Sequence, residues 1–112
     1  MEKEKSKRKV VEAVPEDRLS KSATQFKCIT NKMVETYTKK NHDYGNSFDQ
    51  SLNRFGLVAA QVRMGDKLNR VDSLIEKIAL VEDESIRDTL LDLTNYATMT
   101  VMWLDNNVVN RN

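Results

Sequence analysis

The sequence contains very few of the residues that build disulfide frameworks, zinc sites and β-hairpins. Its 112 residues include one cysteine, one histidine, one proline and three glycines. Because Cys28 has no second cysteine to pair with, an internal disulfide is excluded, and a structural zinc site is not expected. No Asn-Gly or Asp-Gly pair occurs, and no segment alternates apolar and polar residues convincingly. Signals for β-strands are therefore weak.

Long apolar runs and a surplus of one charge are also missing. No segment approaches the roughly 18 apolar residues of a membrane span, and the N-terminal residues lack the apolar core of a signal peptide. We therefore expect a cytoplasmic protein with no membrane partner. The 18 Lys and Arg nearly balance the 17 Asp and Glu, for a net charge of +1. Direct DNA binding is not expected, because DNA-binding domains usually carry a large positive surplus.

What the sequence does contain is helical periodicity, with 39% hydrophobic and 31% charged residues. The pattern predicts an all-α fold, a small helical bundle of three long helices and one short helix. We expect the long helices at about 20–40, 57–79 and 84–105, and the short helix between Ser47 and Gly56. Residues 1–17 are interpreted as a mobile basic arm, 18–105 as a single helical domain, and 106–112 as a frayed tail.

Capping patterns and apolar stripes support these helices. Ser22-Ala-Thr-Gln25 and Ser47-Phe-Asp-Gln50 have the form of capping boxes. Buried stripes are expected on the first helix (Phe26, Ile29, Met33, Tyr37) and on the short helix (Phe48, Leu52, Phe55). The strongest repeat lies on the last helix, at Ile86, Leu90, Leu93, Ala97, Val101 and Leu104. Leftover apolar side chains there (Leu91, Met102, Trp103) predict a homo-oligomer.

One face of the middle helix is densely charged. Arg63, Asp66, Lys67 and Arg70 are spaced i, i+3, i+4 and i+7, which places three cations and one carboxylate within two turns. The last helix has a second polar stripe of Asp88, Asp92 and Tyr96. Because a short connector makes the two helices antiparallel neighbours, we expect both stripes to face one groove, with Asp92 near Arg70 and Tyr96 near Lys67. The segment from His42 to Phe48 would close this groove.

Two interpretations of the stripes remain open. In the first, the stripes neutralise each other through Asp92–Arg70 and Asp66–Lys67 ion pairs, and the chain is a non-catalytic helical interaction protein. In the second, they bind a charged ligand. Cations beside the rings of Tyr44 and Tyr96 suit a base with phosphates.

Three sequence blocks resemble a known family. Asn41-His-Asp-Tyr-Gly-Asn-Ser-Phe48, Arg63-Met-Gly-Asp-Lys-Leu-Asn-Arg70 and Asp88-Thr-Leu-Leu-Asp-Leu-Thr-Asn-Tyr96 are similar to the first nucleotide-modification-associated domain family of small prokaryotic and phage proteins. The resemblance covers about residues 35–104 and implies that the protein handles nucleotides. On this basis we expect a phage-encoded nucleotide-binding module, which could sequester a nucleotide-derived signal. The expected ligand-binding residues are His42, Asp43, Tyr44, Phe48, Arg63, Asp66, Lys67, Arg70, Asp92 and Tyr96.

The last block is also similar to the final helix of all-α nucleoside triphosphate pyrophosphohydrolases of the MazG and dimeric dUTPase type. That resemblance implies an alternative function, Mg²⁺-dependent hydrolysis of nucleoside triphosphates, with Asp66, Asp88 and Asp92 as the metal ligands. The sequence departs from the family pattern, since Asp88 and Asp92 are spaced i, i+4 and the earlier acid is accompanied by Lys67 and Arg70. Cations there repel Mg²⁺ and attract phosphate. No cofactor is therefore expected for the binding module, and Mg²⁺ only for the enzyme.

Overall fold

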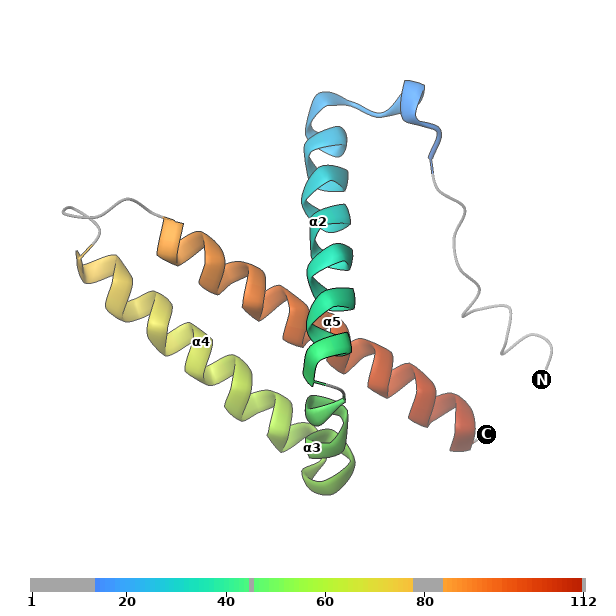
Figure 1. Ribbon diagram of the computed structural model, residues 1–112, viewed down its shortest axis with the longest axis vertical. Helices are drawn as coiled ribbons and strands as arrows, with labels where there is room; N and C mark the ends of the chain where they lie inside the picture. The colour runs from blue at the N-terminus through green and yellow to red at the C-terminus, as the bar shows by residue number, and fades with distance from the viewer. Residues whose placement is uncertain (1–13, 45, 78–83, 112) are drawn as a thin grey trace. The chain divides into compact units, whose positions relative to one another are not determined.

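The computed structural model describes residues 14–44, 46–77 and 84–111, with the side chains of 42–44, 84 and 108–111 excepted. It contains a 3-10 turn, η1 (Glu16–Arg18), and the four helices α2 (Lys21–Tyr44), α3 (Ser47–Phe55), α4 (Leu57–Lys77) and α5 (Glu84–Arg111) (Figure 1). No strand occurs in these ranges. The prediction of an all-α chain with three long helices and one short one is thus confirmed.

The chain divides into two compact units, Met1–Lys32 and Met33–Asn112, and the division falls within α2. Most of the predicted basic arm, residues 1–13, lies outside the described residues, as does the connector at 78–83. The predicted single domain over 18–105 and the predicted fraying of 106–112 stay predictions. Helix α5 itself continues to Arg111, beyond the end expected near Asp105. Across the described part of the chain, no helix is long and apolar enough to cross a membrane.

The described part of the first unit begins with η1 and continues into α2. Ser20 precedes the helix, and its Oγ accepts a hydrogen bond from the backbone N–H of Ala23 at 3.1 Å, which satisfies one free donor of the first turn. The capping box predicted at Ser22 is therefore wrong, because Ser22 lies inside the helix. The predicted burial of Phe26 is also wrong, since that side chain is 71% exposed.

The second unit is built on α4 and α5, which lie side by side (Figure 1). They are antiparallel, since Lys67 contacts Asp92 while Arg63, one turn earlier, contacts Tyr96 one turn later. Helix α3 packs against both, and the indole N–H of Trp103 on α5 donates to Asn53 Oδ1 on α3 at 2.8 Å. Gly56 ends α3 as predicted, and its φ of +70° allows α4 to begin one residue later.

The core of the second unit is small and sits where α3 meets the other two helices. Its buried apolar residues are Phe48, Leu52, Ala59 and Ala60, and the side chains of Met64, Tyr96, Met99 and Trp103 pack against it. The predicted burial of Phe48 and Leu52 is confirmed, whereas Phe55 is 59% exposed. Because Trp103 packs against this core, it is not the free surface residue that the sequence suggested.

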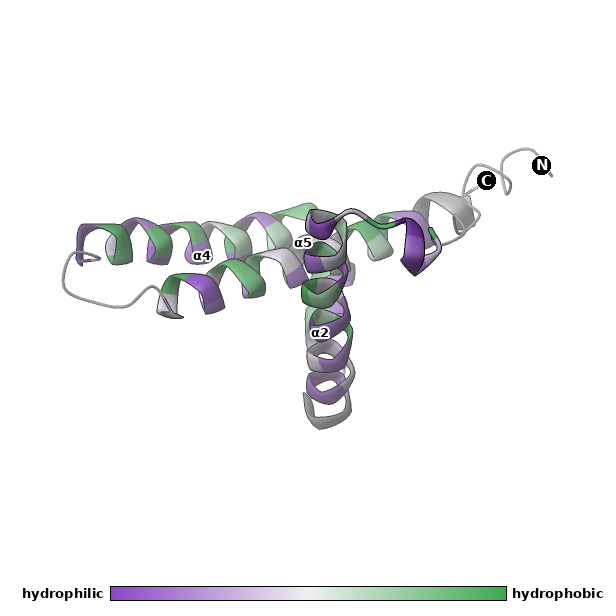
Figure 2. Cartoon of the chain, turned by 90° about the horizontal axis from the view of Figure 1, so that it is seen from above, coloured by the Kyte–Doolittle hydropathy of each residue, from purple (hydrophilic) through white to green (hydrophobic). Residues whose placement is uncertain are grey.

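The inward face of helix α5 mixes apolar side chains that pack against the core, such as Met99 and Trp103, with polar ones. Its buried residues are Thr89 and Thr100, whose hydroxyls donate to the carbonyl oxygens of Ser85 and Tyr96 in the preceding turn. The strong apolar repeat is covered only in part: Ile86, Leu93 and Leu104 are half-buried, whereas Leu90 and Val101 are exposed. Hydrophobic positions recur along the lengths of α4 and α5 in Figure 2. Helical periodicity therefore predicted these helices correctly, although much of the periodic apolar surface is not covered within the second unit.

Candidate functional site

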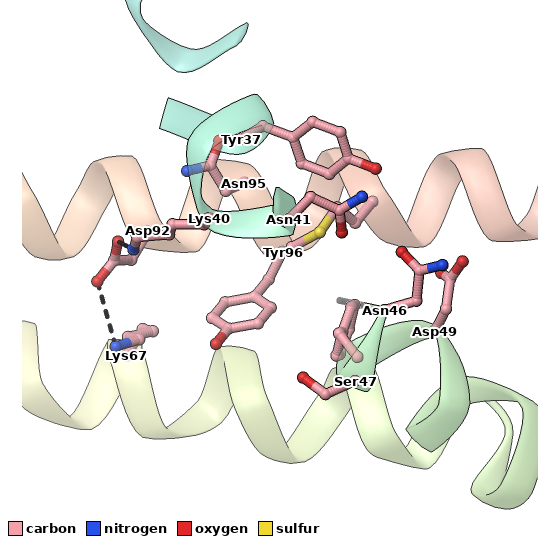
Figure 3. Close-up of a pocket in the computed structure, with 12 residues that line it drawn as sticks. Tyr37, Lys40, Asn41, Asn46, Ser47, Asp49, Lys67, Asp92, Asn95 and Tyr96 are labelled. Atoms are coloured by element: carbon pink, nitrogen blue, oxygen red, sulfur yellow. Dashed lines mark hydrogen bonds and ion pairs between the residues drawn. The ribbon is translucent and has the colours of Figure 1, made fainter. Parts of the chain in front are cut away.

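A cavity of about 390 Å³ opens within the second unit. This volume is within the range of small-molecule sites. Four helices contribute to its wall (Figure 3). The lining residues are Tyr37, Lys40, Asn41, Asn46, Ser47, Phe48, Asp49, Lys67, Asp92, Asn95, Tyr96 and Met99. On α5, Asp92, Asn95, Tyr96 and Met99 are spaced i, i+3, i+4 and i+7, so one face of the helix supplies a whole side of the cavity.

Two ammonium groups share one carboxylate at one end of the cavity. Lys67 Nζ on α4 donates to Asp92 Oδ2 at 3.3 Å, and Lys40 Nζ on α2 lies 3.7 Å from Asp92 Oδ1. The side chains of Lys67 and Asp92 are about one third exposed, and that of Lys40 is more exposed. Because two cations face a single anion, this end has a local excess of positive charge within reach of solvent.

An aromatic pair forms the middle of the cavity wall. The rings of Phe48 and Tyr96 meet edge to face, with centroids 4.9 Å apart and planes at 69°. Phe48 is buried in the core, so it holds the Tyr96 ring in place. In Figure 3 the Tyr96 side chain extends from α5 toward α4, between Lys67 and Ser47. The guanidinium of Arg63 lies 6.0 Å from the centroid of the same ring.

The first turn of α3 forms the opposite end of the cavity. Asn46 is the N-cap residue, and its side chain makes no capping hydrogen bond. The first N–H groups of a helix lack intrahelical partners and carry the positive end of the helix dipole. The lining residues Asn46, Ser47 and Asp49 all come from this turn. The sequence-predicted cap at Ser47 is therefore off by one residue.

The structure brings together four of the ten predicted ligand-binding residues, namely Phe48, Lys67, Asp92 and Tyr96. Arg63 contacts Tyr96 but is exposed and does not line the cavity, and Asp66 and Arg70 are also exposed and outside it. The backbone of His42, Asp43 and Tyr44 belongs to the last turn of α2, where the sequence predicted a loop. Their side chains lie outside the described residues.

The predicted pairing of the two stripes is wrong by one helical turn. Asp92 pairs with Lys67 and Lys40, not with Arg70, and Tyr96 lies near Arg63, although residue counting placed it level with Lys67. The predicted metal ligands Asp66, Asp88 and Asp92 are not brought together: among the described residues, no group of three or more His, Cys, Asp or Glu side chains could hold a metal ion.

Sequence reasoning missed the contribution of α2. Tyr37, Lys40 and Asn41 line the cavity and are spaced i, i+3 and i+4, a pattern visible in the sequence. It was overlooked because the helix was expected to end at Lys40, whereas α2 continues to Tyr44. The amides of Asn46 and Asn95 had no distinguishing signal in the sequence.

Comparison with known proteins gave one match. The family model described as nucleotide modification associated domain 1 matches residues 40–104, which include all of α3 and α4 and most of α5. No curated protein and no solved structure matches the chain. All but one of the residues that line the cavity lie within the matched segment, Tyr37 being the exception.

Proposed function

Because this chain belongs to the nucleotide modification associated domain 1 family, we propose that it binds a phosphorylated nucleotide in the cavity of its second unit. The observation that carries the proposal is the composition of the wall. Two lysines, two carboxylates and three aromatic rings line a space of about 390 Å³, with both lysines and one of the carboxylates, Asp92, at the same end. Polar groups at both ends and a ring between them suit a ligand that combines phosphates with a flat base.

The phosphates would lie at the Lys67 end. A phosphate oxygen can take the place of the Asp92 carboxylate as hydrogen-bond acceptor for Lys67 Nζ and Lys40 Nζ, which are 3.3 and 3.7 Å from that carboxylate. Hydrogen bonds between charged partners are each worth about 1.5–3 kcal/mol. Their partial exposure lets the lysines reorient without opening the core.

The base would lie against Tyr96 and between the amides of the wall. Tyr96 offers a ring whose orientation is held by Phe48. The side chains of Asn41, Asn46 and Asn95 line the same space and provide both donors and acceptors for the edge of a base. A site of this kind would discriminate between bases through hydrogen bonds, since an amide that a bound base covers without pairing is costly.

No particular observation favours the pyrophosphohydrolase alternative, since within the described ranges Asp66, Asp88 and Asp92 do not form a metal-binding group. The proposal is therefore binding without a chemical step, by which the chain would withdraw a nucleotide from solution. A phage origin stays a prediction from the resemblance.

Calorimetry with the full chain tests this proposal. Nucleoside mono-, di- and triphosphates and cyclic nucleotides are titrated with and without Mg²⁺, and each mixture is assayed for released phosphate and pyrophosphate. We expect at least one nucleotide to bind below millimolar concentration. Lys67→Ala should weaken it by about 10- to 150-fold, the equivalent of one charge-assisted hydrogen bond.

Lys77→Ala is the matched control for Lys67→Ala, since both lysines are on α4 and Lys77 does not line the cavity. Lys39→Ala serves in the same way for Lys40→Ala on α2. The proposal is wrong if no nucleotide binds below millimolar concentration, or if Lys67→Ala binds as tightly as Lys77→Ala. Release of pyrophosphate would replace it with the enzymatic alternative.

A further inference from the structure

Helix α4 has an apolar face that the described residues of its own unit leave uncovered. Five aliphatic side chains on this helix are each between 51% and 58% exposed: Leu57, Val58, Val62, Leu68 and Ile75. The residues that pack inward on the same helix are Ala59, Ala60, Met64 and the partly buried Lys67. A soluble chain rarely leaves this many aliphatic side chains open along one helix unless the surface is an interface.

Gly65 lies in the middle of this face. It shares the 3–4 spacing of Val58 and Val62, and a Cβ built on it would meet no atom within 4 Å. Glycine is a poor residue for a helix interior, and nothing within the described part of the chain requires it here. A glycine at an open position allows the backbone of another helix to approach closely.

The pattern on either side of Gly65 is symmetric over two turns. Val62 and Leu68 are three residues away on each side, and Gln61 and Asn69 are four residues away. We propose that a second copy of this chain packs its α4 antiparallel against this face, about a two-fold axis at Gly65. A two-fold interface must be self-complementary, and this arrangement places Val62 of each copy opposite Leu68 of the other.

The charges around the face favour the antiparallel orientation. Arg54 is exposed in the last turn of α3, just before α4. The exposed acids Asp72 and Glu76 lie on the last turns of the apolar face of α4, whereas the exposed Lys77 is on a neighbouring face. An antiparallel pair brings the basic end of one copy to the acidic end of the other. A parallel pair would place like charges together, which opposes association.

The exposed apolar area is sufficient for such a pair. Complete burial of an aliphatic side chain removes about 60–120 Å² from water, and an aromatic side chain buries about 150–250 Å². With the fractions exposed on α4, and with Phe55 at its N-terminal end, pairing would bury about 500–900 Å² of apolar surface in total. This apolar area is similar to the apolar area that the smaller stable protein–protein interfaces bury. The prediction does not depend on the nucleotide site, because Lys67 belongs to the opposite side of the helix.

Light scattering on the full chain provides the first test. We expect about twice the 12.9 kDa of one chain, or an even multiple. Val62→Glu and Leu68→Lys should each raise the dissociation constant of the pair more than about 100-fold, because both copies then bury an unpaired charge. Combining the two substitutions should restore association, because the new carboxylate of each copy then faces the new ammonium group of the other.

The matched control is Val101→Glu, which makes the same change at an equally exposed position of α5 and should leave the pair intact. A single-chain mass for the unaltered protein refutes the proposal. If Val101→Glu dissociates the pair and Val62→Glu does not, the interface lies on α5, and this result also refutes the proposal. Failure of the double variant to associate refutes the antiparallel register.

Cross-linking tests the same geometry without dissociating the pair. In a Cys28→Ser background, Gln61→Cys combined with Asn69→Cys places thiols of the two copies opposite each other on either side of the proposed axis, within the distance that a disulfide can span, and leaves Gly65 unchanged. Mild oxidation should give a covalent pair in high yield. Ser73→Cys, an exposed position on the same helix, should not, because its two copies lie far apart in this arrangement. Equal yields from the two variants refute the axis at Gly65.

Discussion

Asp92→Asn should tighten the binding of a phosphorylated ligand. Asp92 holds Lys67 and Lys40 at 3.3 and 3.7 Å, so a phosphate that approaches the two lysines also approaches this carboxylate. Two unit charges about 6 Å apart repel by roughly 0.7–2.8 kcal/mol for effective dielectric constants between 80 and 20. Removing the charge of Asp92 should therefore improve Kd by about 3- to 100-fold for each unit of phosphate charge at that distance.

The folded state should survive this substitution. The ion pairs of Asp92 are partly exposed, and pairs of this kind contribute about 0–1 kcal/mol to the free energy of unfolding. Calorimetry at low and at physiological ionic strength gives the measurement, and the gain should shrink as salt screens the repulsion. Asp66→Asn is the control, because Asp66 is an exposed acid of α4 that does not line the cavity. Weaker binding by Asp92→Asn, to the extent seen with Lys67→Ala, would mean that Asp92 contacts the ligand itself and would refute this reasoning.

Three further predictions concern stability. Phe48→Ala should lower the free energy of unfolding by about 3–5 kcal/mol in denaturant titration, whereas Phe55→Ala, at an exposed position, should cost much less; equal losses would contradict the placement of the core. Gly56→Ala should cost about 1–3 kcal/mol, because φ +70° and ψ −156° are strained for any residue with a Cβ. Lys27 donates a hydrogen bond to Glu16, and this bond and the lysine charge hold the pKa of Glu16 below its usual value. The contact therefore stabilises the fold at pH values above the usual glutamate pKa, and this stabilisation is lost as the pH falls through the lowered pKa. An NMR titration should show the Glu16 pKa rising when Lys27 is replaced by Met, and an unchanged value would contradict the contact.

The helices were predictable because their signals are local. The 3–4 repeats on α4 and α5 and the position of Gly56 indicated the fold class and most helix boundaries. Which of the apolar side chains are buried was not predictable in the same way. Periodicity identifies an apolar stripe but does not say which neighbour covers it, and on α5 the covered face contains Thr89 and Asp92 while Leu90 and Val101 are open.

The cavity was predictable only in part, for a similar reason. Lys67, Asp92 and Tyr96 stood out because charge and aromatic rings repeat on one face of each helix. Their pairing was missed by one turn, because the register of two antiparallel helices depends on where the connector reverses direction, which residue counting cannot give. Lys40 was missed because the first helix was expected to end at this residue. In the structure, Lys40 faces Asp92.

The polar residues on the inward face of α5 have a consequence for folding. Asp92 and Tyr96 occupy positions toward α4 that aliphatic side chains would take in an ordinary helical pair, and the only large apolar side chains buried within the described part of the second unit are Phe48 and Leu52. If the open faces are buried only between copies, folding and association are coupled, and stability must depend on protein concentration. A tenfold increase in concentration adds about 1.4 kcal/mol to such a pair, which should raise the unfolding midpoint by about 3–6 °C for two chains of this length. Thermal unfolding followed by circular dichroism over a hundredfold range of concentration measures this, with Val62→Glu as the comparison that should show no such dependence. A midpoint that is constant over this range would show that one copy folds alone, with its apolar face exposed to water.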